Sequence, residues 1–380
     1  MPALNGTALD LLTGDAQTFI DKVWASRVHL HQVDRSALVD ILALDDVDRL
    51  VTASGLRTPA LRVVRDGQVC SSSEFTRQAT IAGSPLTGLV DGRKALAMYD
   101  DGATLVLQGL HRYWPPLTQL VRELELALGH PCQANAYLTP PGSQGFARHS
   151  DTHDVFVFQT HGHKQWEIVE DDTARDIVME PGLSMYLPTG TPHSARSQAE
   201  SSLHVTIGVN RTTWRDLLRR RVDAVLADDR YDTPLPAGFI EDPDRLAGPL
   251  EAELAGLVDR LAALAADDVA TLTAERFLRD RAPAMLGALG DRVRLPQLDD
   301  LTRLERRPTA ACLLRDDGDR LRVLLGDREL RMPIRLRPAM EMVRDQASFV
   351  VGDLSACLDP QSRLVLCRRL VREGLLRFPR

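Results

Sequence analysis

Three residues between positions 149 and 193 have the types and spacing of a metal site. His149 and Asp151 are two residues apart, and residues at that spacing on a β-strand point to the same face. His193 ends a turn-like "LPTGTPH" far enough downstream for strands to bring it back. Two histidines and one carboxylate form the facial ligand set that leaves positions on iron open for an organic co-substrate and dioxygen. The alternative is three polar residues without a metal, because His-x-Asp also occurs by chance.

Further histidines gather in the same part of the chain, which holds six of the ten. We interpret His153, two residues beyond the carboxylate, as facing a substrate or supporting a ligand rather than binding the metal. His161 and His163 flank a glycine in a hairpin-like turn and are expected to be exposed. His204 lies in the strand-like "SLHVTIGV", where a buried or ligand-supporting histidine is the favoured interpretation.

The segment that contains these residues has the sequence pattern of short β-strands. From about Gln133 to Val209, stretches such as "DVFVFQTHGHKQWEIV" and "SLHVTIGV" alternate with Pro/Gly turns. Regularly spaced short strands with turn signals predict a sandwich or barrel, including the double-sheet jelly roll of cupins. The preceding residues mix signals, with Asp15 as a helix N-cap and "ALRVVRDGQV" as a hairpin.

After Asn210 the sequence becomes rich in Ala, Leu, Glu and Arg, and leucines recur at intervals of three and four residues from Leu250 to Leu264. This spacing predicts amphipathic helices. From about Arg292, strands joined by a D-G turn precede a final helix with Asp359 as N-cap and Gly374 just past its end. We expect a small winged-helix-like module there.

The final helix carries four arginines that could contact phosphate or simply face solvent: Arg363, Arg368, Arg369 and Arg372. The chain as a whole has a formal net charge of −7. This balance gives no general reason to bind nucleic acid or an anionic membrane. Direct nucleic-acid binding is therefore not expected, and a protein partner is favoured.

Composition places the chain among globular proteins, with 44% hydrophobic and 26% charged residues among 380. That length predicts two or three domains. No apolar run is long enough to span a bilayer, and the first residues lack the pattern of a secretory signal, so a cytoplasmic location is expected. The five cysteines are scattered without a C-x-x-C pair, which argues against a disulfide framework or a Cys-rich zinc site.

The stretch "NAYLTPPGSQGFARHSDTHDVFVFQTHGHKQWEI", followed by "EPGLSMYLPTGTPHSA" and "SSLHVTIGV", resembles the JmjC-type cupin hydroxylases, and most of all their ribosomal oxygenase branch. The likeness extends in outline over residues 15–210. It implies an α+β protein: a double-stranded β-helix (jelly-roll) catalytic domain over residues 1–210, a helical dimerisation region over 211–290 and a winged-helix-like domain over 291–380.

The resemblance also assigns roles to individual residues. His149, Asp151 and His193 match the iron ligands. Lys164 matches the basic residue that pairs with the distal carboxylate of 2-oxoglutarate, which a cation at the end of a cavity can anchor. Asn135 matches a polar residue that lines the co-substrate pocket.

Two positions depart from the pattern of these relatives. Gly208 stands where they often have serine, and Ser150 stands where they often have tyrosine after the first ligand. Both departures affect the expected shape of the pocket.

The resemblance implies a hydroxylase that uses Fe(II), 2-oxoglutarate and O2 to modify a side chain of a protein, often a ribosomal one. Two alternatives stay open: the same chemistry on a peptide natural product or small molecule, and a non-catalytic, zinc-binding cupin that serves as an interaction module. Lys164 discriminates against the latter, because a structural zinc site needs no anchor for a dicarboxylate. A homodimer formed through residues 214–281 is expected, without membrane association.

Overall fold

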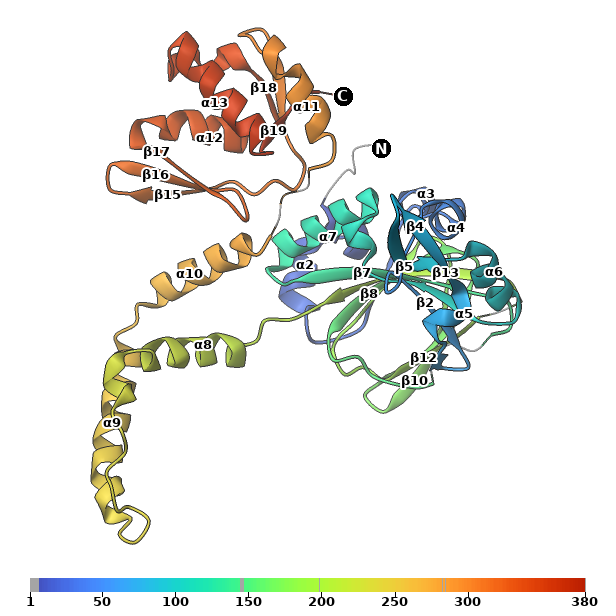
Figure 1. Ribbon diagram of the computed structural model, residues 1–380, viewed down its shortest axis with the longest axis horizontal. Helices are drawn as coiled ribbons and strands as arrows, with labels where there is room; N and C mark the ends of the chain where they lie inside the picture. The colour runs from blue at the N-terminus through green and yellow to red at the C-terminus, as the bar shows by residue number, and fades with distance from the viewer. Residues whose placement is uncertain (1–6, 144–146, 198, 282, 284, 380) are drawn as a thin grey trace. The chain divides into compact units, whose positions relative to one another are not determined.

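The computed structural model describes residues 7–143, 147–197, 199–281, 283 and 285–379 (Figure 1). The chain forms two compact units. One extends through Arg211, and the other contains Thr212–Pro283 and the residues from Ala288 onward. The sequence predicts three domains, and the structure groups its predicted helical and C-terminal segments into one unit.

The first unit is built on two antiparallel sheets. The larger has eight strands in the order β1-β11-β8-β13-β7-β6-β2-β3, and the smaller has three in the order β10-β9-β12. The strands of the larger sheet are β1 (His29–Gln32), β2 (Leu61–Arg65), β3 (Gln68–Val69), β6 (Thr104–Leu107), β7 (Cys132–Thr139), β8 (Asp154–His161), β11 (Leu183–Leu187) and β13 (Ser202–Val209). Those of the smaller are β9 (Lys164–Glu170), β10 (Thr173–Met179) and β12 (His193–Ser197).

The chain crosses repeatedly between these sheets, since β8, β11 and β13 belong to the larger and β9, β10 and β12 to the smaller. Such alternation is typical of a jelly roll. The predicted β-rich sandwich between Gln133 and Val209 is thereby confirmed. A separate hairpin is formed by β4 (Thr76–Ile81) and β5 (Ser84–Val90).

Strand β8 shows why the two sheets pack in this way. Its residues are buried on both faces, and its central residues Val155–Phe158 form an apolar run instead of alternating with polar ones. Val155 and Val157 pack between the sheets in a core cluster with residues such as Trp166. Phe156 and Phe158 belong to a larger core that includes residues of the flanking helices. The strand therefore joins the jelly-roll interior to the helical layer.

The helices of this unit are α1 (Ala8–Thr13), α2 (Ala16–Lys22), α3 (Arg35–Val39), α4 (Leu44–Ala53), α5 (Ser72–Phe75), α6 (Gly92–Asp100) and α7 (Pro115–Leu128). Helix α7 begins with prolines at its first positions and ends at Gly129 in the left-handed conformation, the pairing of start and stop signals expected for a helix. It buries Leu117, Leu120 and Leu124, and it contacts β7.

The turn between β8 and β9 requires a glycine. Gly162 has φ +59°, and a Cβ at this position would lie 1.9 Å from the carbonyl oxygen of Ser201. No side chain fits there, so the hairpin that leads from β8 to Lys164 depends on this residue.

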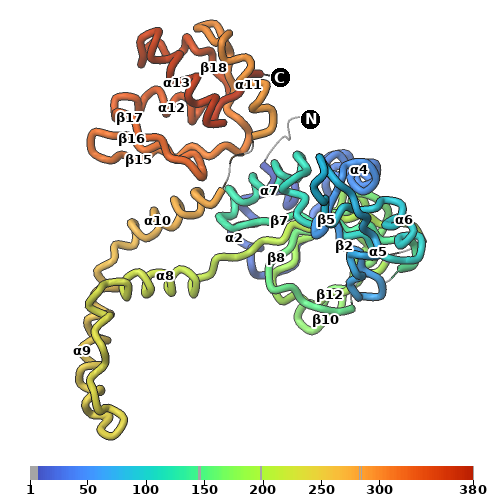
Figure 2. The backbone as a smooth tube through the Cα atoms, viewed as in Figure 1, coloured from blue at the N-terminus to red at the C-terminus, as the bar shows by residue number. Residues whose placement is uncertain are grey.

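The second unit begins with α8 (Trp214–Leu226), α9 (Asp244–Ala262) and α10 (Ala266–Arg279), which follow one another along the chain (Figure 2). Its C-terminal part contains α11 (Ala288–Arg294), α12 (Arg337–Asp345) and α13 (Pro360–Arg372). Two three-stranded sheets accompany them, one of β18 (Ser348–Val350), β14 (Arg303–Arg306) and β19 (Leu376–Arg377), the other of β15 (Leu313–Asp317), β16 (Arg320–Leu324) and β17 (Glu329–Pro333).

Helix α13 has the boundaries that its sequence predicts. The Asp359 carboxylate accepts hydrogen bonds from the backbone N–H groups of Gln361 and Ser362. Pro360 occupies the first helical position, and Gly374 follows the helix with φ +79°. Among the helices of the described residues, none is both long and apolar enough to cross a membrane.

Candidate metal and co-substrate site

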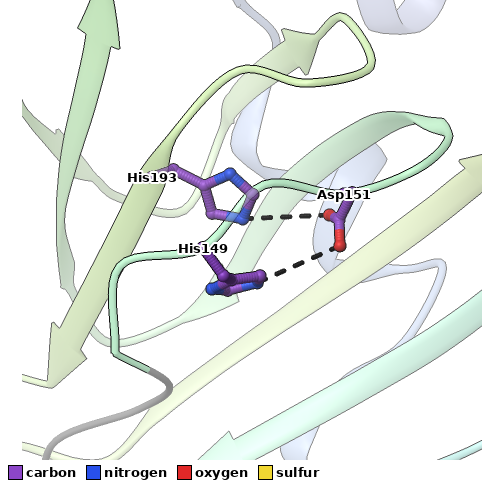
Figure 3. A group of neighbouring side chains, drawn as sticks. All are labelled: His149, Asp151 and His193. Carbon is purple, nitrogen blue, oxygen red and sulfur yellow. Dashed lines mark ion pairs between the residues drawn. The ribbon is translucent and has the colours of Figure 1, made fainter.

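The three predicted ligands converge in the structure, as Figure 3 shows. One ligand atom from each of His149, Asp151 and His193 lies within 4.8 Å of the other two. The Asp151 carboxylate oxygens are 4.0 Å from Nε2 of His149 and 3.8 Å from Nε2 of His193. These separations suit three atoms arranged around one ion on one side.

Backbone hydrogen bonds hold the two histidines together. The N–H of His149 donates to the carbonyl of His193 at 3.0 Å, and the N–H of His193 donates back at 2.8 Å. This bridge lies outside the continuous ladders of the sheets. The carbonyl of Asp151 accepts from the N–H of Gly190 at 3.0 Å, so all three ligand segments are fixed by main-chain contacts.

Both imidazoles have their tautomer set by a backbone carbonyl. Nδ1 of His149 lies 2.9 Å from the Ala147 oxygen, and Nδ1 of His193 lies 3.0 Å from the Thr191 oxygen. Because a carbonyl oxygen only accepts, each Nδ1 carries the hydrogen and each Nε2 keeps a lone pair for a metal. Burial lowers the pKa of His193, which favours the neutral form that binds metals.

The turn that carries His193 is anchored by Asp154, the fully buried first residue of β8. One carboxylate oxygen accepts from both the N–H and the hydroxyl of Thr189, at 2.8 and 2.6 Å. The other accepts from the Tyr186 hydroxyl at 2.6 Å, and Arg211 forms an ion pair at 3.3 Å. Asp154 therefore positions the turn that precedes the third ligand.

A cavity of about 280 Å³ opens beside the triad. Its lining combines the ligands with one buried lysine, one arginine, aromatic rings and aliphatic side chains: Arg62, Val64, Thr104, Tyr137, Thr139, His149, Asp151, Val155, Val157, Lys164, Trp166, Leu187, His193, Ala195, His204 and Thr206. The only carboxylate in this lining is the metal ligand Asp151, so the cavity wall attracts anions.

Lys164 lies in this cavity with only 3% of its surface exposed. Its Nζ donates to the Thr139 hydroxyl at 3.0 Å, and the Thr104 hydroxyl donates to Thr139 at 3.2 Å. Burial lowers the pKa of Lys164 from 10.5 to about 7. Burial also places the pKa of His204 well below its usual value, with the Lys164 charge adding to the effect, so His204 is neutral.

Three buried polar atoms on the cavity wall have no hydrogen-bond partner among the described residues: Arg62 Nε, Trp166 Nε1 and His204 Nδ1. Leaving such groups unpaired is costly. A ligand with carboxylate oxygens would accept from the Arg62 and Trp166 donors and from the Lys164 ammonium. The donor set therefore fits a small dicarboxylate bound beside a metal held by the triad.

The lowered pKa of Lys164 predicts a specific dependence of stability on pH. Between pH 7 and 10.5 the unfolded chain binds up to one more proton at this residue than the folded chain, so the free energy of unfolding should rise with pH by up to about 1.4 kcal/mol per unit. Lys164→Met should remove this contribution. The check is urea unfolding of metal-free wild type and variant at pH 7 and 9; parallel pH dependences would contradict the assignment.

His153 does not line the cavity, and neither does Asn135. Asn135 lies on β7, two residues before Tyr137, and its side-chain oxygen accepts a hydrogen bond from the N–H of Gly109 at 3.0 Å. The cavity lining on this strand consists of Tyr137 and Thr139 instead. These residues share the face of Asn135 by strand alternation, a pattern from which they could have been found.

One of the two departures from the resemblance, Gly208, lies against His153. A Cβ at Gly208 would lie 2.7 Å from Cδ2 and Nε2 of His153. The absence of a side chain at Gly208 therefore makes room for the His153 imidazole, which does not belong to the group of ligands. Ser150 is exposed.

The remaining histidines of this region lie outside the triad. His163 is exposed and forms an ion pair with Glu200, whereas His161 is half-buried. His204 is buried and stacks on Tyr137 with ring centroids 4.9 Å apart. Its ring supports the cavity wall, in line with the interpretation drawn from its strand.

Comparison with known proteins defines the class of this domain. Residues 111–217, which include the triad and Lys164, match the family model of the JmjC domain. The fold is similar to the solved structure of YcfD, described as a ribosomal oxygenase from Escherichia coli, with a TM-score of 0.55, 19% identity and coverage of 97% of this chain and 99% of that one. Residues 111–217 of the first unit are thus similar to JmjC domains, and the β-rich, cupin-like architecture agrees with this similarity.

Proteins with similar sequences include ribosomal oxygenases. Ribosomal oxygenase 1 of Danio rerio is 26% identical over 345 residues, covering 73% of this chain and 63% of the relative. The Bifunctional lysine-specific demethylase and histidyl-hydroxylase NO66 of Branchiostoma floridae is 33% identical over 150 residues, covering 38% and 24%. The chain thus spans less than two thirds of these relatives. The resemblance to JmjC ribosomal oxygenases that the sequence predicts is confirmed.

Proposed function

We propose that the protein is an Fe(II)- and 2-oxoglutarate-dependent oxygenase that hydroxylates a side chain of a ribosomal protein. The observation that carries this proposal is the presence, in one cavity, of the His149-Asp151-His193 triad and the buried Lys164. A facial triad leaves positions open for a co-substrate and dioxygen. A buried cation anchors the free carboxylate of a dicarboxylate.

Each part of the cavity has a task in this proposal. The triad would hold Fe(II), and Lys164 with the Thr139 hydroxyl would bind the distal carboxylate of 2-oxoglutarate. When bound, these two groups supply the chemistry that inserts one oxygen atom of O2 into a C–H bond. Aliphatic side chains such as Val157 and Leu187 line the cavity and exclude water from the reacting atoms.

The names of similar proteins support the substrate class. They include ribosomal oxygenases, and one solved structure is titled "Structure of YcfD a Ribosomal oxygenase from Escherichia coli in complex with Cobalt and 2-oxoglutarate". A non-catalytic zinc site would not require a buried lysine beside the ligands. Hydroxylation of a peptide or small molecule would use the same residues. The following test distinguishes this alternative from hydroxylation of a ribosomal protein.

The test compares intact masses of ribosomal proteins from source cells with and without this gene. We expect one protein of the deletion strain to lack the mass of a single oxygen. The purified enzyme with Fe(II) and 2-oxoglutarate should restore that mass, whereas its Asp151→Ala form should not. If no ribosomal protein differs, the substrate class is wrong, and succinate release with peptides or small molecules becomes the screen.

We also propose that the second unit combines a dimerisation region with a winged-helix-like module. The winged-helix-like module is supported by α11, α12 and α13 around the three-stranded sheet β18-β14-β19. The dimerisation region is supported by apolar side chains exposed on successive turns of α9, where Leu250, Leu254 and Val258 are 48%, 52% and 63% exposed. Such a stripe needs a covering surface, which a second copy of the chain would supply.

The dimer proposal predicts the effect of one charge on this stripe. Leu254→Asp should shift the protein from dimer to monomer, because an unpaired carboxylate would be buried at the interface. Ala255→Asp introduces the same charge about 100° around the helix and serves as the matched control. Light scattering coupled to size-exclusion chromatography checks both. A wild-type monomer, or equal effects of the two variants, would contradict the proposal.

A further inference from the structure

A second hollow lies in the C-terminal part of the chain, between α11 with its following turn and the end of α13. These two helices contact each other. The groove has a volume of about 570 Å³ and is lined by Arg292, Leu295, Pro296, Arg368 and Arg372. Among the described residues, its lining contains three guanidinium groups, two apolar residues and no carboxylate.

Two of the three groove arginines are held by backbone carbonyls. Arg292 donates to the carbonyl of Arg372 at 3.0 Å and to that of Ala288 at 3.3 Å. Arg368 donates to the carbonyl of Leu298 at 3.4 Å. Among the described residues, no carboxylate lies within 4.0 Å of Arg292, Arg368 or Arg372. The carbonyls fix guanidinium groups without neutralising their charge.

The other arginines of α13 behave differently. Arg363 is paired with Asp300, and Arg369 with Glu373 at 2.7 Å. Of the four arginines that the sequence suggests as a phosphate-contacting face, the structure therefore neutralises two. It leaves Arg368 and Arg372 available and adds Arg292 from α11.

The surrounding segment has a charge opposite to that of the whole chain. Residues 288–380 contain 19 arginines and no lysine, against 14 aspartates and glutamates, so their formal charge is +5 while the chain as a whole carries −7. An average over the chain hides this contrast. The argument from net charge against a polyanion does not apply to this module.

We propose that this groove binds the phosphodiester backbone of RNA. Arg368 and Arg372 are one helical turn apart on α13 and present charge on one face, and Arg292 extends the row from α11. Guanidinium groups bind phosphate oxygens through paired hydrogen bonds. The repeated anionic groups of a nucleic-acid strand match a row of fixed cations in an open groove. The alternative, a purely structural role, is that these arginines only stabilise the C-terminal end of α13.

The experiment measures binding of the full-length protein to a fluorescently labelled single-stranded RNA by anisotropy at several salt concentrations. The variant Arg292→Gln/Arg368→Gln/Arg372→Gln removes the groove cations. The control Arg331→Gln/Arg337→Gln/Arg344→Gln removes the same charge from arginines paired with Glu329, Asp316 and Asp345. No metal or 2-oxoglutarate is added, so the result does not depend on the proposed oxygenase activity.

The groove variant should bind RNA at least about tenfold more weakly. The slope of log K against log salt should fall by about 2, since three phosphate contacts contribute about 0.7 each for a single strand. The control should keep most of the wild-type slope. If the triple variant does not fold, the double variant Arg368→Gln/Arg372→Gln takes its place, because it keeps the hydrogen bond from Arg292 to the carbonyl at the end of α13. Its matched control is then Arg337→Gln/Arg344→Gln.

Three results would overturn the proposal: no binding of RNA by the wild type, equal losses in groove and control variants, or displacement of the RNA by polyglutamate at equal charge concentration. The last result would identify an acidic protein as the partner. Circular dichroism of every variant confirms that the fold is intact.

Discussion

Replacing Asp151 with alanine is expected to abolish metal binding and turnover together. The carboxylate lies between the two imidazoles, 4.0 and 3.8 Å from their Nε2 atoms, and its loss leaves only two ligands. Loss of a residue that merely supports a ligand costs about 10 to 100-fold in metal affinity or activity. Loss of the ligand itself should lower the metal affinity and the activity by more than about 1000-fold. Bound iron and succinate release are the measurements.

Asp176→Ala provides the matched control for this substitution. Asp176 is exposed on β10, in the sheet that also contains β12 with His193. Its loss should leave both metal content and turnover unchanged. An Asp151→Ala protein that keeps full turnover would show that the triad is not the metal site.

Replacing Lys164 with methionine should raise the KM for 2-oxoglutarate by about 30-fold or more while sparing metal binding. Loss of one partner from a buried charge pair costs about 2 kcal/mol at the low end, and each 1.4 kcal/mol is about tenfold in affinity. Because the pKa of Lys164 is about 7, the wild-type affinity for 2-oxoglutarate should also fall as pH rises above 7. In the variant this dependence should disappear.

The measurement is succinate release against 2-oxoglutarate concentration at pH 6.5 and 8.5, with iron content determined in parallel. Lys94→Met is the matched control, since the Lys94 ammonium donates to the Thr76 carbonyl and does not line the cavity. If the KM does not change in Lys164→Met, another residue anchors the co-substrate. Arg62 would then be the next candidate, because its Nε is buried without a partner among the described residues.

The metal ligands could be predicted because their geometry is local or marked by a turn. His149 and Asp151 are two residues apart, and His193 follows a Pro/Gly turn. The strand period predicts that His149 and Asp151 share a face, although the structure places both before β8, outside the continuous ladders. The jelly roll was predictable for a related reason, since strands such as β8 are short, apolar and separated by turn residues.

The rest of the cavity depends on pairing between distant strands. Arg62 and Thr104 come from β2 and β6, far from the triad in sequence, and no spacing rule connects them to Tyr137. Their alignment follows from sheet register, in which Arg62 pairs with Val106 and Val106 with Tyr137. Asn135 illustrates the converse, because its place on the correct strand face did not ensure a place in the cavity.

The formal charge of the C-terminal module can be counted from the sequence. Which of its arginines are paired with a carboxylate cannot. Arg363 and Arg368 both belong to α13. Only the structure shows that Arg363 pairs with Asp300 from a distant segment and that Arg368 lines a groove. Counter-ions are set by tertiary packing, which helical spacing does not reveal.

The reciprocal backbone hydrogen bonds between His149 and His193 bear on which ion the protein acquires. These bonds and the carbonyl contacts of both Nδ1 atoms hold the imidazoles through the main chain, so every divalent ion meets the same two nitrogens and one carboxylate. The intrinsic affinities of nitrogen and oxygen ligands for first-row divalent ions rise from manganese to copper, so they do not by themselves select iron. The ion in the cell is then decided by cellular supply, and purified material should be stripped and reloaded before its activity is compared between preparations.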